Sequence, residues 1–419
     1  MTEWRKVRLG DCCEITSSKR IFYNEYVESG VPFYRSKEII EKAKGDTIST
    51  PLFISHARFK EIQESFGAPQ KRDLLLTAVG SLGIPYLIND SNPFYFKDGN
   101  LIWFKSFNGD LNSEFLYYWF KTRSAFQMLD KIAIGSAQKA LTISSIKQIS
   151  IEIPARDIQD RIVTVLSRYD ALIENYQRQI KLIEEAAQRL YKEWFVDLRF
   201  PGHQSTSIIN NLPQSWQKKT VEECLIFHGN GGWGKDSHTG KYEHPGKVIR
   251  GTDIEDIKTG RYSDLPLRFH TDNDIKKRTL KKNDLVFELS NGNINNIGRC
   301  LLIDDIILNN TGDNTICASF CKLLRPIDRL HALMLYWEIQ DMQTSGRMLP
   351  LKKQGANGIN NFDFDGFLSH VLLIPADESL ISPLEIITRR IGRIQGEIAL
   401  LREARDRLLP KLMSSEIDV

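Results

Sequence analysis

The chain contains two similar halves, and this duplication limits its fold more than any local motif does. Short matching segments recur in the same order in both halves: Trp4 with Trp216, residues 32–36 with 247–251, 71–75 with 282–286, 116–119 with 334–337, and Ile153-Pro154 with Ile374-Pro375. Matching residues lie between 211 (Asp73 to Asp284) and 221 positions apart (Pro154 to Pro375). We therefore expect one kind of globular domain, present twice in diverged form.

Each half ends in a segment that predicts a long amphipathic helix. Its apolar residues recur at alternating spacings of four and three, which is the pattern of coiled-coil packing. The first stripe consists of Ile162, Leu166, Tyr169, Ile173, Tyr176, Ile180, Ile183, Ala187, Leu190 and Trp194. The second consists of Leu380, Leu384, Ile387, Ile391, Ile394, Ile398, Leu401, Leu408 and Leu412, with Arg405 as a polar member. A coiled-coil seam is expected, and a single helix packed on the side of a globular core stays open as the alternative.

The duplication and the stripes together predict an α+β chain in four parts. We expect an N-terminal mixed domain over residues 1–155, a spacer helix over 156–200, a linker with a C-terminal mixed domain over 201–376, and a second spacer helix over 377–419. Phe200-Pro201-Gly202-His203 should end the first helix, because proline and glycine interrupt helices. The apolar run from Leu74 to Ile88 is expected to form core strands around a turn.

The first spacer helix has no excess of either charge. Residues 156–200 contain eight Lys or Arg and eight Asp or Glu. Such a balance argues against a helix that binds phosphates and favours a spacer with a docking surface. A helix over residues 160–195 would be about 50 Å long, which equals roughly 15 base pairs of DNA.

The composition indicates a reducing, non-membrane setting. The net charge is +3, which permits a polyanionic partner without requiring one. The six cysteines show neither a CxxC pair nor zinc-finger spacing, and Cys317 and Cys321 are best interpreted as buried free thiols of a cytoplasmic protein. The start of the chain has no apolar core of a signal peptide, and Leu74–Ile88 is too short for a membrane span of about 20 residues.

One loop resembles a phosphate-binding motif. Residues 229–235 (GNGGWGK) contain G-x-G-x-x-G and also G-x-x-x-x-G-K. A phosphate loop needs Ser or Thr after the lysine and then a helix, whereas Asp236 follows here and the next residues are rich in Gly, Pro and His. A flexible binding loop is the preferred interpretation.

Two further enzyme motifs are incomplete. Asn92-Pro93-Phe94-Tyr95 lacks the second proline of the amino-methyltransferase motif Asn-Pro-Pro-Tyr. Asp284 and Glu288 provide the acids of a nuclease site, but Ser290 stands where its lysine should be. A structural role for the two acids is preferred.

Polar and basic residues gather in probable loops of both halves. Lys and Arg can neutralise phosphates, while Asn, Gln and Arg can bind base edges through two hydrogen bonds. The DNA-binding candidates are Lys19, Arg20, Arg35, Lys37, Lys71, Arg72, Ser136, Gln138, Lys139, Lys235, Arg250, Asn291, Asn293, Asn295, Lys352, Lys353, Gln354 and Asn357. Phe22 and Tyr23 accompany the first of them. For each residue, an ordinary solvated loop remains the alternative.

The chain resembles the specificity subunit of type I restriction-modification systems along essentially its whole length. The resemblance rests on residues 4–11 (WRKVRLGD), on 135–144 (GSAQKALTIS), and on Ile153-Pro154 leading to Gln159–Ile162. In the family the helix usually starts with Glu-Gln; here Ile158 replaces the acid, and the second copy after Pro375 lacks the glutamine as well.

The resemblance implies a non-catalytic DNA-recognition subunit. Each globular domain would be a target-recognition domain that reads one half of a split, asymmetric double-stranded DNA target. The two helices would pair antiparallel, with a pseudo-two-fold axis relating the domains. Two modification (methyltransferase) subunits would dock on the helices, and restriction subunits would join them. S-adenosylmethionine, ATP and magnesium would belong to those partners, in a system that methylates DNA and defends against foreign DNA.

Two other functions stay open on the sequence alone. A coiled-coil scaffolding module would use the seam as a protein-interaction surface without DNA readout. An enzyme is the third possibility, and it requires activity of the purified chain alone.

Overall fold

The structure, a computed structural model, describes residues 4–45, 48–135, 139–210, 212–355, 358–414 and 416–417. Its contacts divide the chain into two units. Unit 1 comprises Met1–Ala171 and Glu403–Val419, and unit 2 comprises Leu172–Arg402. Each unit combines helices and strands, and each takes in part of both long helices.

Unit 1 is built on a four-stranded antiparallel sheet. Its order is β2 (Glu14–Thr16), β9 (Leu101–Lys105), β6 (Leu74–Thr77), β7 (Pro85–Leu87). A second sheet has the order β3 (Tyr26–Val27), β5 (Phe53–Ile54), β4 (Val31–Tyr34), β8 (Tyr95–Phe96), and β1 (Arg5–Arg8) pairs with β10 (Ser150–Ile153). The helices are α1 (Leu9–Cys12), α2 (Ser36–Lys44), α3 (His56–Phe66), α4 (Ser113–Phe120), α5 (Arg123–Ile132) and α6 (Ile143–Lys147). The expected strands around a turn within Leu74–Ile88 are β6 and β7.

Unit 2 repeats the main sheet of unit 1 and adds small sheets to it. Its main sheet has the order β14 (Leu225–Asn230), β21 (Cys321–Pro326), β17 (Leu285–Glu288), β19 (Cys300–Leu302). The other sheets are β16 (Leu267–His270), β15 (His244–Ile249), β20 (Ile316–Cys317); β13 (Gln217–Thr220) with β24 (Val371–Ile374); β18 (Ser290–Asn291), β23 (Asn360–Phe362), β22 (Lys352–Lys353); and β11 (Ile208–Ile209) with β12 (Leu212–Pro213). The helices are α8 (Ile254–Lys258), α9 (Asp272–Arg278), α10 (Asp305–Thr311), α11 (Arg329–Thr344) and α12 (Phe364–Leu368).

The duplication extends to individual hydrogen bonds before the central strands β6 and β17. Arg72 and Asn283 both have positive φ, at 74° and 72°. Their N–H groups donate to the carbonyls of Ile88 and Ile303, each at 2.8 Å. The next residue, Asp73 or Asp284, accepts a hydrogen bond from the backbone N–H three residues earlier. The matching segments found in the sequence therefore form the same turn in both units.

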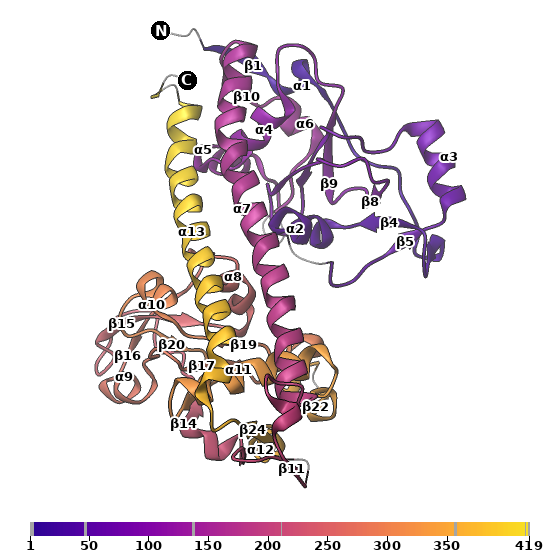
Figure 1. Cartoon of the computed structure of the whole chain (residues 1–419). Helices are drawn as coiled ribbons and strands as arrows, with labels where there is room; N and C mark the ends of the chain where they lie inside the picture. The colour runs from indigo at the N-terminus through magenta and orange to yellow at the C-terminus, as the bar shows by residue number, and fades with distance from the viewer. Residues whose placement is uncertain are drawn as a thin grey trace. The chain divides into compact units, whose positions relative to one another are not determined.

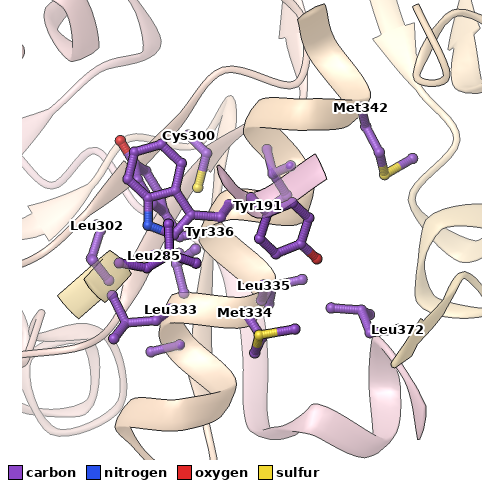
Figure 2. Close-up of a cluster of buried hydrophobic side chains, with 14 of the residues drawn as sticks. Tyr191, Leu285, Cys300, Leu302, Leu333, Met334, Leu335, Tyr336, Met342 and Leu372 are labelled. Atoms are coloured by element: carbon purple, nitrogen blue, oxygen red, sulfur yellow. The ribbon is translucent and has the colours of Figure 1, made fainter. Parts of the chain in front are cut away.

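The core of unit 2 surrounds α11, whose residues from His331 to Ile339 are all buried. Figure 2 shows Leu333 and Tyr336 of this helix on the side of Leu285 and Cys300 of the main sheet, and Met334 on the side of Leu372. In unit 1 the shorter α4 has the equivalent place, with Phe115 and Leu116 fully buried in one cluster with Phe104. A helix that is apolar on most sides needs burial on most sides, which explains its position against the sheet.

The long helices α7 (Arg156–Tyr191) and α13 (Ser382–Met413) pair antiparallel, as expected (Figure 1). In unit 1, Arg405 of α13 donates a hydrogen bond to Asp170 of α7, and Leu166 shares a core cluster with Leu409. In unit 2, the side chains of Tyr176 and Glu397 form a hydrogen bond. The residue numbers therefore decrease along α13 in the direction in which they increase along α7, as in an antiparallel pair. A short π-helix, Lys192–Val196, follows α7.

The two long helices begin differently. Gln159 in the first turn of α7 is fully buried: its side-chain oxygen accepts from the N–H of Asn112, and its amide donates to the carbonyls of Pro154 and Asp110. The second helix, which lacks this glutamine, follows a 3-10 turn at Glu378–Ile381 and has Pro383 at its second position. Proline suits a first turn because its missing N–H would have no helical partner there.

All six cysteines are free and buried, which agrees with the interpretation of Cys317 and Cys321. Burial raises the pKa of the Cys300 and Cys317 thiols to about 12, so neither is a thiolate near neutral pH. Among the described residues, no helix combines the length and apolar character that a membrane crossing requires.

Candidate nucleic-acid interface

Two candidate arginines form matching forks at matching places in the two units. Arg35 follows β4, and its backbone N–H, Nε and Nη2 all donate to the carboxylate of Glu38. Glu38 is fully buried. Burial alone would raise the pKa of Glu38, but the hydrogen bonds from Arg35 outweigh it and lower the pKa below its usual range. The fork therefore holds a charged guanidinium in a fixed orientation.

In unit 2 the same fork joins Arg250, which follows β15, to Asp253. The backbone N–H of Arg250 donates to Asp253 at 2.7 Å, and Nε and Nη2 donate at 2.9 and 2.6 Å. Gly251 follows the arginine, and a Cβ there would collide with Oε1 of Glu288. Glycine thus allows the Glu288 carboxylate, paired with Arg299 at 2.8 Å, to lie directly beside the fork.

The other candidates of the first loop region are exposed; Arg20 and Lys37 lie near the Arg35 fork, and Lys19 lies beside Phe66. The ammonium of Lys19 lies 4.5 Å from the ring centre of Phe66, and Arg20 pairs with Asp98 at 2.9 Å. Lys37 donates to the Thr50 hydroxyl at 3.3 Å. These three side chains carry positive charge at the surface of unit 1.

The remaining described candidates of unit 1 lie away from that region. Lys71 and Arg72 are exposed in the turn before β6, where Arg72 lies 3.7 Å from Glu114. Lys139 pairs with Asp130 at the end of α5. Ser136 and Gln138 lie outside the described residues.

The asparagines of unit 2 shape a loop after β17. Asn291 donates to Glu288 at 2.7 Å and accepts from the N–H of Asn293, whose own side chain accepts from the N–H of Asn295. Their side chains therefore serve the loop's own backbone as well as its surface.

The last candidates are divided between burial and exposure. Lys352 donates to Gln343 at 3.2 Å, and burial lowers the pKa of its ammonium. Lys353 pairs with Asp363 at 3.0 Å, and Gln354 is exposed. Asn357 lies outside the described residues.

The glycine-rich loop after β14 is a packed connection. Gly231 donates to the carbonyl of Cys321, and a Cβ there would collide with the carbonyls of Cys317 and Ala318. No α-helix follows within the described residues up to α8, so the geometry of a phosphate loop is missing there. Lys235 is exposed, 5.8 Å from the ring centre of Tyr242.

The incomplete enzyme motifs have structural roles. Asp284 pairs with Arg325 at 2.7 Å, and Glu288 with Arg299. Phe94 and Tyr95 are buried core residues. Within the described residues no group of three His, Cys, Asp or Glu side chains could hold a metal ion.

Each unit has a groove at its arginine fork. The groove of unit 1 has a volume of about 620 Å³ and is lined by Arg35, Arg20, Phe22, Tyr23, Lys97 and Asn100, among others. The groove of unit 2 has a volume of about 530 Å³ and is lined by Arg250, Trp233, Glu288, Ser290, Asn291 and Phe320, among others. The sequence did not identify four of these lining residues: Lys97, Asn100, Trp233 and Phe320. Trp233 could have been found, because an aromatic residue inside a glycine-rich loop indicates a binding surface.

The predicted coiled-coil residues are all at least partly buried, and several belong to the core clusters of the two units. Each of Ile162, Leu166, Tyr169, Ile173, Tyr176, Ile180, Ile183, Leu190, Ile387, Ile391, Ile394, Ile398, Leu401 and Leu408 is buried or partly buried. The apolar side chains that the helices leave exposed are others, including Leu182, Ile386 and Leu400.

Comparisons with known proteins agree on one family. Residues 1–185 match the type I restriction modification DNA specificity domain. The type I restriction enzyme MjaIX specificity subunit of Methanocaldococcus jannaschii is 25% identical over 374 residues, which cover 83% of this chain and 78% of that protein. A putative type I restriction enzyme specificity subunit of Haemophilus influenzae, S.HindORF215P, is 27% identical over 187 residues, or 44% of this chain and 45% of that protein.

A solved structure supports the fold. The crystal structure of a type I restriction-modification S subunit from M. genitalium aligns with a TM-score of 0.52 at 15% identity, covering 98% of this chain and 96% of that chain. With the duplicated domains and paired helices described above, these matches make the chain similar to type I restriction-modification specificity subunits.

Proposed function

We propose that this chain reads a bipartite, asymmetric DNA target on behalf of a type I restriction-modification enzyme. The observation that carries the proposal is a shared framework with different surfaces. The turns before β6 and β17 and the two arginine forks match, whereas the side chains around the forks differ. A duplicated scaffold with unlike surfaces suits two unlike half-sites.

The same proposal assigns the chemistry to partner subunits. Two methyltransferase subunits would dock on the paired helices, and restriction subunits would join them. S-adenosylmethionine, ATP and magnesium would be bound by those partners. The complex would act in the cytoplasm, which agrees with six free, buried cysteines in this chain.

The test is target selection by the complex. The chain is co-purified with its methyltransferase partner and incubated with a library of random DNA duplexes, and the bound fraction is sequenced. The expected result is one motif with two defined halves of different sequence, separated by a gap of fixed length. Enrichment of no motif, with the complex intact, would overturn the proposal and favour a scaffolding module.

A further inference from the structure

We propose that each unit reads its half-site in the groove at the carboxyl ends of its parallel strand pair, β4 with β8 and β15 with β20. The ligand is the set of hydrogen-bond acceptors and methyl groups on base edges in the DNA major groove. This inference rests on the proposed function and adds where the bases bind.

The two grooves occupy equivalent places in the duplicated fold. Phe33 and Tyr34 pair in parallel with Tyr95 and Phe96, as Val248 and Ile249 pair with Ile316 and Cys317. Beyond the strands, the N–H of Lys97 donates to the carbonyl of Tyr34, and the N–H of Ala318 to that of Ile249, both at 2.8 Å. One groove wall thus begins at Lys97 or Ala318, and the other at Arg35 or Arg250.

Two other grooves are less suited to the role. One is lined by residues 194 and 199–205, which follow α7, and the other lies beside β1 and β10 with Lys6, Arg8 and Asp110. These two grooves differ from each other in their place in the fold and in their lining. Of these four grooves, the two fork grooves match in place between the units while differing in lining, as two readers of different half-sites must.

The arginine forks provide oriented donors. In both, Nε and Nη2 hold a carboxylate, and no hydrogen bond within the described residues uses Nη1. An arginine whose far edge is fixed by a carboxylate loses less conformational entropy when it binds. Nη2 also donates to the Thr50 hydroxyl in Arg35 and to the carbonyl of Asp264 in Arg250, so the N–H groups of Nη1 remain. They can donate to guanine O6 or N7, the acceptors that arginine most often contacts in DNA.

Aromatic side chains stand at both grooves. Phe22 and Tyr23 line the first groove and are exposed, although large aromatic residues are usually covered. Trp233 and Phe320 line the second and are exposed as well. They can contact thymine methyl groups and exclude water from the arginine–base bonds.

The linings predict unlike base preferences. The first groove adds the cations Arg20 and Lys97 to its fork, and Asp98 is paired with Arg20 there. The second adds Ser290 and Asn291 beside the paired Glu288. The first groove therefore offers mainly donors, whereas the second offers both donors and acceptors.

The experiment compares groove variants with matched surface variants in the complex with its methyltransferase partner. The double variant Phe22→Ala/Tyr23→Ala tests the first groove, and Trp233→Ala/Phe320→Ala tests the second. Phe126→Ala is the control in unit 1, since Phe126 is 59% exposed against 60% for Phe22. Ile226→Ala is the control in unit 2, at 65% against 62% for Phe320.

Each groove variant should relax one half of the selected motif and leave the other half unchanged. Affinity for the wild-type target should fall roughly 5- to 150-fold, the range for losing one specific base pair. Affinity for a scrambled duplex should not change, and the controls should match the wild type. An unchanged motif, relaxation of both halves, or an equal loss on scrambled DNA would each overturn the inference. If the wild-type complex selects no motif, the proposed function fails instead.

Discussion

At the residue scale, a partly buried ion pair explains the one polar member of the second stripe. Arg405 is 13% exposed and pairs with Asp170 on α7. Tyr118 donates to the same carboxylate at 2.8 Å, and Lys121 lies 3.8 Å from it. Burial would raise the pKa of Asp170, but Lys121, Arg405 and these hydrogen bonds together lower it. A polar residue fits the seam because its charge is balanced there.

Removing the arginine should destabilise unit 1. Arg405→Met retains much of the side-chain volume but leaves Asp170 without its closest cation. We expect the free energy of unfolding to fall by about 3 kcal/mol, as for other broken buried ion pairs. Arg407→Met is the matched control, because Arg407 is on the same helix but highly exposed. Urea unfolding followed by circular dichroism measures both, and an equal effect of the two changes would contradict the prediction.

The same pair predicts a pH dependence. Because the folded pKa of Asp170 is lowered, its stabilising contribution is present above the unfolded pKa of about 3.9 and is lost as the pH falls through the folded value. The difference in free energy of unfolding between the wild type and Asp170→Asn should therefore be largest at about pH 6–7. It should shrink below roughly pH 4. Unfolding curves across this range test it. A difference that grows on acidification would show that the carboxylate is not stabilised by its partners.

At the element scale, the helical seam depends on a few buried side chains. Ile398 of α13 is fully buried in the core of unit 2, whereas Ile386 on the same helix is 65% exposed. Ile398→Ala should lower the free energy of unfolding by roughly 2–5 kcal/mol, since it removes apolar contacts and leaves a cavity. Ile386→Ala should change it by less than about 0.5 kcal/mol. Thermal unfolding of the two variants compares the same substitution at two places on one helix. Similar losses of stability would contradict the different roles of the buried and the exposed face.

The seam could be predicted from sequence because its signal is local. A 4-3 apolar spacing identifies the buried face of a helix without knowledge of its partner. The parallel pairing of β4 with β8 could not be predicted in this way. Each of these strands contributes only two paired residues, and they lie far apart in the chain. The groove that depends on this pairing could therefore not be predicted from the sequence, although Arg35 and Arg250 were predicted as DNA-binding candidates.

The carboxylate partners of the two arginine forks could have been predicted from the sequence. Glu38 and Asp253 both lie three residues after the arginine, and this repeated spacing marks an acid that can bond the arginine at a helix start. The asparagine loop shows the opposite limit. Asn293 was a base-contact candidate, but its side chain accepts a backbone hydrogen bond in its own loop, a geometry that composition does not reveal.

At the scale of the whole molecule, the two units combine a common framework with separate recognition surfaces. A net charge of +3 on 419 residues gives no broad attraction to a polyanion. Binding to DNA should then depend on local clusters of Lys and Arg for affinity and on the grooves for sequence. Phosphate contacts release counterions and weaken with salt, whereas base contacts carry the sequence preference. These two contributions can be separated experimentally.

We expect the affinity of the methyltransferase complex for its selected target to fall linearly with salt on a double-logarithmic plot, by roughly 10³-fold or more between 50 and 200 mM if six or more phosphates are contacted. The Trp233→Ala/Phe320→Ala variant should bind the target more weakly at every salt concentration but with the same slope, because it removes base contacts and no phosphate contact. Fluorescence anisotropy with target and scrambled duplexes measures both quantities. Target binding that ignores salt would favour the scaffolding alternative, and a reduced slope in the variant would mean that the second groove holds the DNA backbone rather than its bases.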